Sequence, residues 1–155
     1  LMSENDDYLT SFPVKIGGVY PFRIVCQPHA GKYGTEYKIN FGIYCLPHEK
    51  ENSVRLIAEI LIVDKDHVAA CSVSCQLMFQ EKIEFDLTSE DLNTMTEKYA
   101  DWVQHLLWDS GAMVLRSVTA SIAPTMTIPM KTPDMHIIYV STKNKDNESR
   151  KPSDN

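Results

Sequence analysis

Hydrophobic and polar residues alternate in the first half of the chain, and this alternation predicts antiparallel strands. Over residues 37–45 every odd-numbered side chain is apolar, whereas Lys38, Asn40 and Gly42 are not. A period of two with a single apolar face is typical of a strand that is buried on one side only. Two further strands are predicted at residues 54–63 and 68–79, joined by polar turns at residues 47–53 and 64–67.

An earlier strand is predicted over residues 18–27. Pro21 lies inside it, and because proline has no amide donor it favours an edge strand or a bend. The segment ends in QPHAGKYG, whose proline and glycines indicate a loop that leads into the next strand.

A helical period replaces the alternation in the second half of the chain. Thr88 or Ser89 can cap the helix, acidic residues follow in its first turn, and the pattern ends before Pro124. Apolar side chains recur at helical spacing between these points. We therefore expect Trp102 and Met113 to pack in the core.

Two segments of the second half are consistent with more than one structure. Residues 109–111, Asp-Ser-Gly, are either the solvent side of the helix or a point where it loosens. Residues 135–140 have the β-branched content of a strand but the position of a terminal helix.

The order of these elements predicts the α+β class, with an antiparallel sheet of about four strands followed by a long helix on one sheet face. The ordered domain is expected over residues 11–140. Residues 1–10 carry little apolar content and are expected to be flexible. Residues 141–155 contain no large apolar side chain, which predicts a disordered polar tail.

The predicted strand at residues 54–63 is apolar on both faces, since Ile57, Leu61 and Val63 fall on the face opposite Ile60. One long helix can cover only one of these faces. The second face therefore needs a partner, and a symmetric homo-oligomer is the simplest one. The alternative is that the N-terminal segment or the C-terminal stretch covers this face within the chain.

Composition and charge narrow the class of protein. The chain has 155 residues and a net charge of −6, so a strongly basic footprint for nucleic acid is absent. No apolar run approaches the roughly 18 residues that cross a bilayer. The first ten residues are acidic and polar where a secretory signal is basic and then apolar. With four cysteines in apolar contexts, these features predict a soluble cytoplasmic protein with free core thiols and no membrane insertion.

Few residues carry catalytic or metal-binding chemistry, and no cofactor or metal is expected. Cys71 and Cys75 point the same way along a strand, about 13 Å apart at ~3.3 Å per residue, too far for a shared zinc or a disulfide. Asp86, Glu90 and Asp91 gather near the helix start, where acids complement the helix dipole. If one of them is instead a general base, the chain is a small-molecule enzyme or carrier of the thioesterase type, on a helix-wrapped antiparallel sheet.

In pattern and order of elements the chain resembles the SecB family of export chaperones over about residues 18–133. The bent first strand corresponds to GGVYPFRIVCQ, and the crossover loop corresponds to PHAGKYGTE. The antiparallel meander corresponds to YKINFGIYC, VRLIAEILIV and VAACSVSCQLMF. The long helix corresponds to QHLLWDSGAMVLRSVTASI, and the proline-flanked stretch after it corresponds to APTMTIPMKTP.

The resemblance implies a protein without enzymatic activity. Members of the family are tetramers, built as dimers of dimers, that hold unfolded or precursor polypeptides in apolar grooves without ATP and serve protein export. Each side chain to which the resemblance points can also be a core residue. By position, it implies client contacts at Tyr20, Phe22, Tyr33, Leu107, Trp108, Met126 and Ile128.

The chain departs from the family at its C-terminal end. The family's C-terminal helix is shortened to DMHIIYV or lost. In the family an acidic tail helps to dock the translocase motor ATPase, whereas residues 141–155 carry four basic and three acidic side chains. Docking to the motor is therefore the weaker of the partner predictions. A SecB-like adaptor for one dedicated partner, such as the antitoxin of a toxin–antitoxin pair, is a further alternative.

Overall fold

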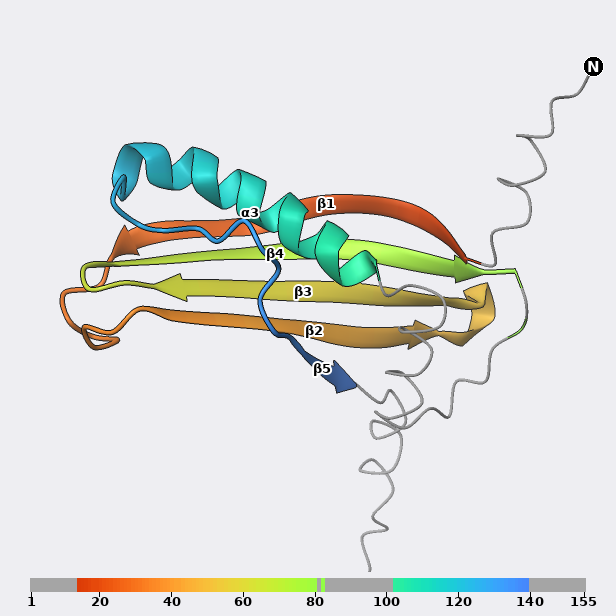
Figure 1. Cartoon of the computed structure of the whole chain (residues 1–155). Coiled ribbons are helices and arrows are strands. Elements are labelled where there is room, and N and C mark those ends of the chain that lie inside the picture. The colour runs from red at the N-terminus through yellow and green to blue at the C-terminus, as the bar shows by residue number, and fades with distance from the viewer. Residues whose placement is uncertain (1–13, 81, 83–101, 140–155) are drawn as a thin grey trace, which may run out of the picture.

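The structure, a computed structural model, describes residues 14–80, 82 and 102–139. Figure 1 shows a long helix lying across one side of a sheet, so the predicted α+β class is confirmed. The elements are β1 (Val14–Pro28), β2 (Lys38–His48), the short 3-10 helix η1 (Glu49–Glu51), β3 (Ser53–Val63), β4 (His67–Phe79), α3 (Val103–Ile122) and β5 (His136–Tyr139).

The sheet has five strands in the order β1-β4-β3-β2-β5. The first four pair as antiparallel neighbours, and the strands predicted from the alternation are confirmed. β5 pairs in parallel with β2, through residues 136–139 and 42–45. The segment at residues 135–140 therefore contributes a strand and not a terminal helix over its described part.

β1 is an edge strand, as Pro21 predicts. Two bulges interrupt its pairing with β4, and the second lies between Phe22 and Ile24. Arg23 is the extra residue there and has a φ of 53°, a left-handed conformation that is uncommon outside glycine. Because of this extra residue, Phe22 and Ile24 face opposite sides of the sheet although two positions separate them.

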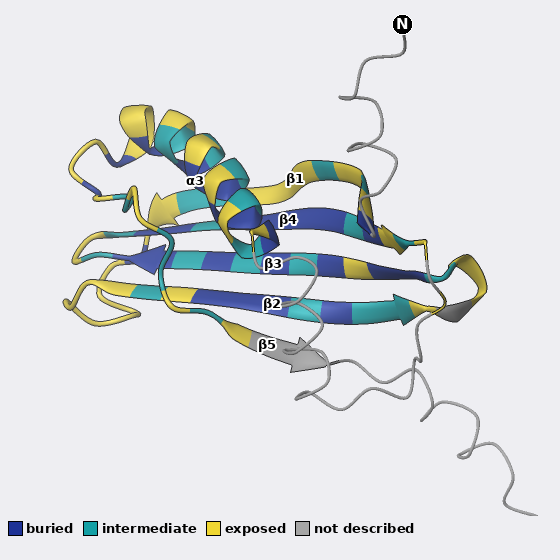
Figure 2. Cartoon of the chain, turned by 45° about the vertical axis from the view of Figure 1, so that its right-hand side comes forward, coloured by how far each residue is buried: buried dark blue, intermediate teal, exposed yellow. Residues whose placement is uncertain are grey.

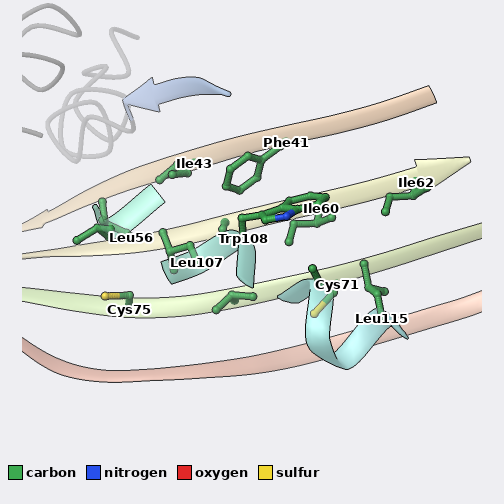
Figure 3. Close-up of a cluster of buried hydrophobic side chains, with 14 of the residues drawn as sticks. Phe41, Ile43, Leu56, Ile60, Ile62, Cys71, Cys75, Leu107, Trp108 and Leu115 are labelled. Carbon is green, nitrogen blue, oxygen red and sulfur yellow. The ribbon is translucent and has the colours of Figure 1, made fainter. Parts of the chain in front are cut away.

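The side of the sheet that faces α3 forms the core. Phe41, Ile60 and Cys71 are direct neighbours across β2, β3 and β4, and all three are buried. Trp108 of α3 lies over them, with its ring centroid 5.5 Å from that of Phe41 (Figure 3). Other side chains that are fully buried in the core are Ile62, Leu77, Leu107, Leu115, Val54, Val73, Val103 and Cys45.

The chain that follows α3 covers part of the same side. Residues 123–135 run from the end of α3 back across the sheet to β5 (Figure 1). The Tyr37 hydroxyl donates to the Thr127 carbonyl at 2.6 Å, and the Arg116 guanidinium donates to the Pro129 carbonyl at 2.8 Å. Three side chains of the segment pack against the core, namely Met126, Ile128 and Met135.

A stripe of small residues lets α3 lie close to the sheet. A Cβ added at Gly111 would lie 2.4 Å from Cδ1 of Ile60 and 3.1 Å from Cγ2 of Val73. Ala112 and Thr119 continue the stripe and are buried. Neither interpretation of the Asp-Ser-Gly segment holds at this glycine, because α3 is continuous through it and the glycine lies against the sheet.

The same stripe corrects the expected positions of two large side chains. Trp102 is 38% exposed and Met113 is 65% exposed, so the prediction that both pack in the core is wrong. The observed stripe runs through Leu107, Gly111 and Leu115 at intervals of four residues. Large apolar residues set the phase of the predicted stripe, and the small residues that make the closest contacts carry little weight in such a pattern.

Two expectations lie outside the described residues and stay predictions, namely the flexible segment at residues 1–10 and the disordered tail at residues 141–155. The prediction that the helix ending before Pro124 begins at Thr88 or Ser89 is wrong, because α3 begins at Val103 with Trp102 at its N-cap. Both predicted caps lie outside the described residues.

Replacing Gly111 with alanine is expected to destabilise the fold, because the new methyl group collides with Ile60, which is only 1% exposed and has little room to move. Overpacking a core costs about 1–3 kcal/mol. The roughly 1 kcal/mol by which alanine exceeds glycine in helix propensity offsets only part of this cost. Urea unfolding measures the difference. Ser117→Ala, at an exposed position of the same helix, is the control and should change stability by less than about 0.5 kcal/mol. An unchanged midpoint for Gly111→Ala would contradict the close contact between helix and sheet.

Candidate functional site

The side of the sheet opposite α3, here called the open face, combines apolar and short polar side chains. Strand register places Tyr20 and Phe22 of β1 beside Ser74 and Ser72 of β4, on the side away from the core. α3, the long helix among the described residues, packs on the other side. The open face is defined by the strand side chains on this side, namely Lys15, Tyr20, Phe22, Arg23, Lys38, Tyr44, Arg55, Ile57, Glu59, Leu61, Ser72 and Ser74.

The aromatic residues of β1 are the most exposed large apolar side chains of the open face. Tyr20 is 54% exposed and Phe22 is 39% exposed, with their ring centroids 6.3 Å apart. Figure 2 shows exposed positions along much of β1, in contrast with the largely buried β4 beside it. Large exposed apolar side chains that lie next to one another are typical of surfaces that bind other molecules.

Ile57 and Leu61 of β3 continue the apolar surface toward the centre of the sheet. Both are half-buried, whereas Ile60 on the core side is fully buried. The prediction that this strand is apolar on both faces is therefore confirmed, and the described residues place a helix over only one of them.

Two shallow hollows lie on the open face. The first has a volume of about 440 Å³ and lies next to the crossover loop between β1 and β2. The second has a volume of about 390 Å³ and lies over the middle of the sheet. Tyr33, Lys38, Asn40, Leu61 and Val63 line the first hollow, and Arg23, Asn40, Tyr44, Glu59, Leu61 and His136 line the second.

The crossover loop, residues 29–37, holds Tyr33 at the first hollow. His29 is buried and anchors the loop to the turn between β3 and β4. Its Nε2 lies 2.8 Å from the Asp64 carbonyl, and its Nδ1 accepts the Gly31 amide at 3.1 Å. A neutral ring with its proton on Nε2 satisfies both partners. The Tyr33 ring packs edge-on against this imidazole at a centroid distance of 5.6 Å.

Glu59 lies at the centre of the second hollow. The Ser72 hydroxyl donates to its Oε2 at 2.8 Å, and no described residue gives its Oε1 a hydrogen bond. Gly42 follows on the next strand, and His136 of β5 lies beyond it. A Cβ at Gly42 would lie 2.9 Å from Nε2 of His136, so the missing side chain lets the imidazole lie over β2.

The structure separates the seven side chains to which the resemblance pointed. Tyr20 and Phe22 lie on the open face, and Tyr33 lies at its edge. Ile128 is half-buried on the helix side. Leu107, Trp108 and Met126 are buried, and core packing accounts for them.

Sequence reasoning did not single out Tyr44, Glu59 or Arg23, although all three line the second hollow. Tyr44 occupies a position to which the alternation assigns the less apolar side of its strand. The bulge that inserts Arg23 shows only in the strand register and has no signal in composition.

Three of the four cysteines, Cys45, Cys71 and Cys75, are core residues, and Cys26 is half-buried. All four are free, as predicted. Burial raises the pKa of Cys45 to about 12 and the pKa of Cys75 to about 11. Burial, with a smaller effect from Glu59, raises the pKa of Cys71 to about 11. Burial also raises the pKa of Cys26, and the Asp64 carboxylate adds to that rise. Thiols with such pKa values are weak nucleophiles at neutral pH.

Among the described residues, no group of three or more histidine, cysteine or acidic side chains is placed to hold a metal ion. None of the helices in this part of the chain has the length and hydrophobicity that a membrane span requires.

No family model matches the chain, and no curated protein matches its sequence. Among solved structures, it is similar to the Mycobacterium tuberculosis Rv1957 SecB-like chaperone, which was solved in complex with a ChAD peptide from the Rv1956 HigA1 antitoxin. The identity is 14% and the TM-score is 0.46, with 81% of this chain and 94% of that chain covered. It is also similar to a protein of unknown function from Streptococcus agalactiae, with 9% identity, a TM-score of 0.38, and 66% and 90% of the two chains covered.

Cys26 is expected to be the first thiol to react in the folded protein, because it is half-buried on β1 whereas the other three are at most 1% exposed. At about pH 8 the raised pKa values leave little thiolate, so the three core thiols should react only after unfolding. An aromatic disulfide reagent measures this, first without and then with urea. Cys26→Ser should abolish the reaction of the folded protein and leave three thiols to titrate in urea. Rapid modification of several thiols in the folded state would contradict the burial described above.

Proposed function

We propose that the chain is an ATP-independent chaperone, a holdase that binds unfolded or precursor polypeptides. The open face carries this proposal, because Tyr20 and Phe22 expose large rings beside the half-buried Ile57 and Leu61. Unfolded chains expose side chains of the same kind, and burial of apolar area is favourable whatever their order. Low sequence specificity follows. No nucleotide is needed, because binding alone shifts the client's folding equilibrium.

The two hollows can accept side chains of an extended client. They are shallow and open to solvent, with volumes of about 440 and 390 Å³. An extended chain turns every second side chain to the same side, so a client can alternate between contacts with the face and contacts with solvent. Tyr20, Phe22 and Tyr33 are the proposed aromatic contacts.

Two kinds of client fall within the proposal. One is a range of precursor polypeptides held for export from the cytoplasm, and the other is one dedicated partner such as an antitoxin. Recovery of many unfolded proteins with the chain favours the first, and recovery of one stoichiometric protein favours the second. The thioesterase-type alternative depends on Asp86, Glu90 and Asp91, which lie outside the described residues, and no observation on the described ones favours it.

The holdase is proposed to work as a homo-oligomer, a dimer or a tetramer built as a dimer of dimers. The outer side of α3 exposes Met113 and Ile122 and so offers a surface to a second copy. Light scattering coupled to size exclusion should give two or four times the chain mass of 17.6 kDa. A single species at the mass of one chain would contradict the assembly.

The double variant Tyr20→Ser/Phe22→Ser is expected to suppress the aggregation of a denatured substrate several-fold less well than the parent protein. Full burial of one large apolar side chain is worth roughly 1.5–3 kcal/mol, and the variant removes two of them from the open face. The effect is measured as the turbidity of a substrate that is diluted out of denaturant, without nucleotide and with the chaperone at a nearly equimolar concentration.

Met130→Ser is the matched control, because Met130 is exposed but belongs to the segment on the helix side. It should retain full activity. If both variants lost the same amount of activity, or if the double variant lost none, the client contacts would not lie at Tyr20 and Phe22.

A further inference from the structure

We propose that the open face selects polypeptide segments whose apolar residues are flanked by Asp and Glu. This inference rests on the proposed function and names its client class. The chain as a whole is acidic, with 15 lysines and arginines against 21 aspartates and glutamates. Its open face is basic, because the strand positions there comprise one acid, Glu59, and four cations: Lys15, Arg23, Lys38 and Arg55.

The four cations are free to meet a partner. All four are exposed, and none of their side chains forms an ion pair or a hydrogen bond with another described residue. Arg116 on the helix side is different, since its guanidinium is bound to the Pro129 carbonyl and fixes the segment after α3. The fold therefore uses Arg116 internally and leaves the cations of the open face available.

These cations surround the apolar centre. Lys38 lines the first hollow together with Tyr33, and Arg23 lines the second. Arg55 lies opposite Gln76 and Lys15 lies opposite Met78, toward the far end of the face. The Glu51 carboxylate reaches this end as well, where it accepts a hydrogen bond from Gln76 at 3.0 Å. A segment with an apolar middle and acidic flanks complements this distribution. Its apolar residues can contact the apolar centre, and its carboxylates can pair with the surrounding cations.

The backbone at Arg23 adds to the argument. A bulge re-aims the side chain at which it occurs, and left-handed non-glycine residues cluster at binding sites. Arg23 has a φ of 53° and is the extra residue of its bulge, and it lines the second hollow. The bulge thus places the Arg23 guanidinium on the open face. With regular pairing, Arg23 would lie on the opposite side of β1 from Phe22.

Glu59 favours a polypeptide over other acidic molecules. It lies in the middle of the basic surface, and its Oε1 has no hydrogen bond from a described residue. A main-chain amide of a bound segment can donate to this oxygen. A phosphodiester chain or a phosphate headgroup offers only acceptors along its backbone and is repelled by the carboxylate.

Two labelled peptides with identical aromatic and aliphatic residues test the proposal, one with Glu and the other with Lys at every remaining position. We expect the acidic peptide to bind about tenfold more tightly by fluorescence anisotropy in low salt, and the difference to vanish near 1 M salt, where the Debye length falls to about 3 Å. Lys38→Glu and Arg55→Glu should each weaken the acidic peptide several-fold and strengthen the basic one. Lys131→Glu, which changes the net charge equally but lies in the segment on the helix side, should leave both unchanged.

The outcomes separate this inference from the proposed function. Equal, salt-independent binding of both peptides would overturn the charge preference and leave the holdase standing. Binding of neither peptide, with no suppression of aggregation, would overturn the holdase itself. Competition by duplex DNA or by anionic vesicles at equal charge concentration would reassign the face to a phosphate-bearing partner. A fall in oligomer mass in Arg55→Glu but not in Lys131→Glu would reassign it to a second copy of the chain.

Discussion

The close contact between α3 and the middle of the sheet is the constraint on which the rest of the structure depends. At Gly111 the helix comes so near to β3 and β4 that a methyl group would not fit beside Ile60. Trp108, one turn earlier, fills the space over Phe41. The helix and the segment after it are thereby committed to one side of the sheet. The apolar residues on the other side of β3 must be covered by something else.

Small side chains of β4 give the open face its shape. On that strand Ser74 lies between Tyr20 of β1 and Ile57 of β3. Ser72 lies between Phe22 and Glu59, and both serines are small and buried. Small residues between two rows of larger ones produce a surface with relief and not a flat apolar plane. A flexible polypeptide can follow such relief, because each of its side chains adjusts separately.

β2 and β4 could be predicted from the sequence because apolar and less apolar residues alternate along them, and β3 because it is a continuous apolar run between two polar turns. β5 could not, because it is four residues long and its partner lies more than ninety positions earlier. The rotation of α3 was missed for a related reason: contact is made by Gly111 and Ala112, which a hydrophobic pattern hardly registers. Of the candidate site, the aromatic residues of β1 could be found from the order of elements. Arg23 and Glu59 could not, since a bulge and a lone carboxylate acquire meaning only once strands are in register.

The irregular shape of the edge strand β1 affects whether further strands can add to the sheet. A long, regular, unpaired strand beside an apolar sheet face is a template on which copies add without limit, as in cross-β fibres. β1 is long, but Pro21 leaves a gap in its row of amide donors and two bulges break its register. An added strand would lose its alignment after a few residues. The irregularity that brings Arg23 to the surface therefore also makes β1 a poor template for the addition of further strands.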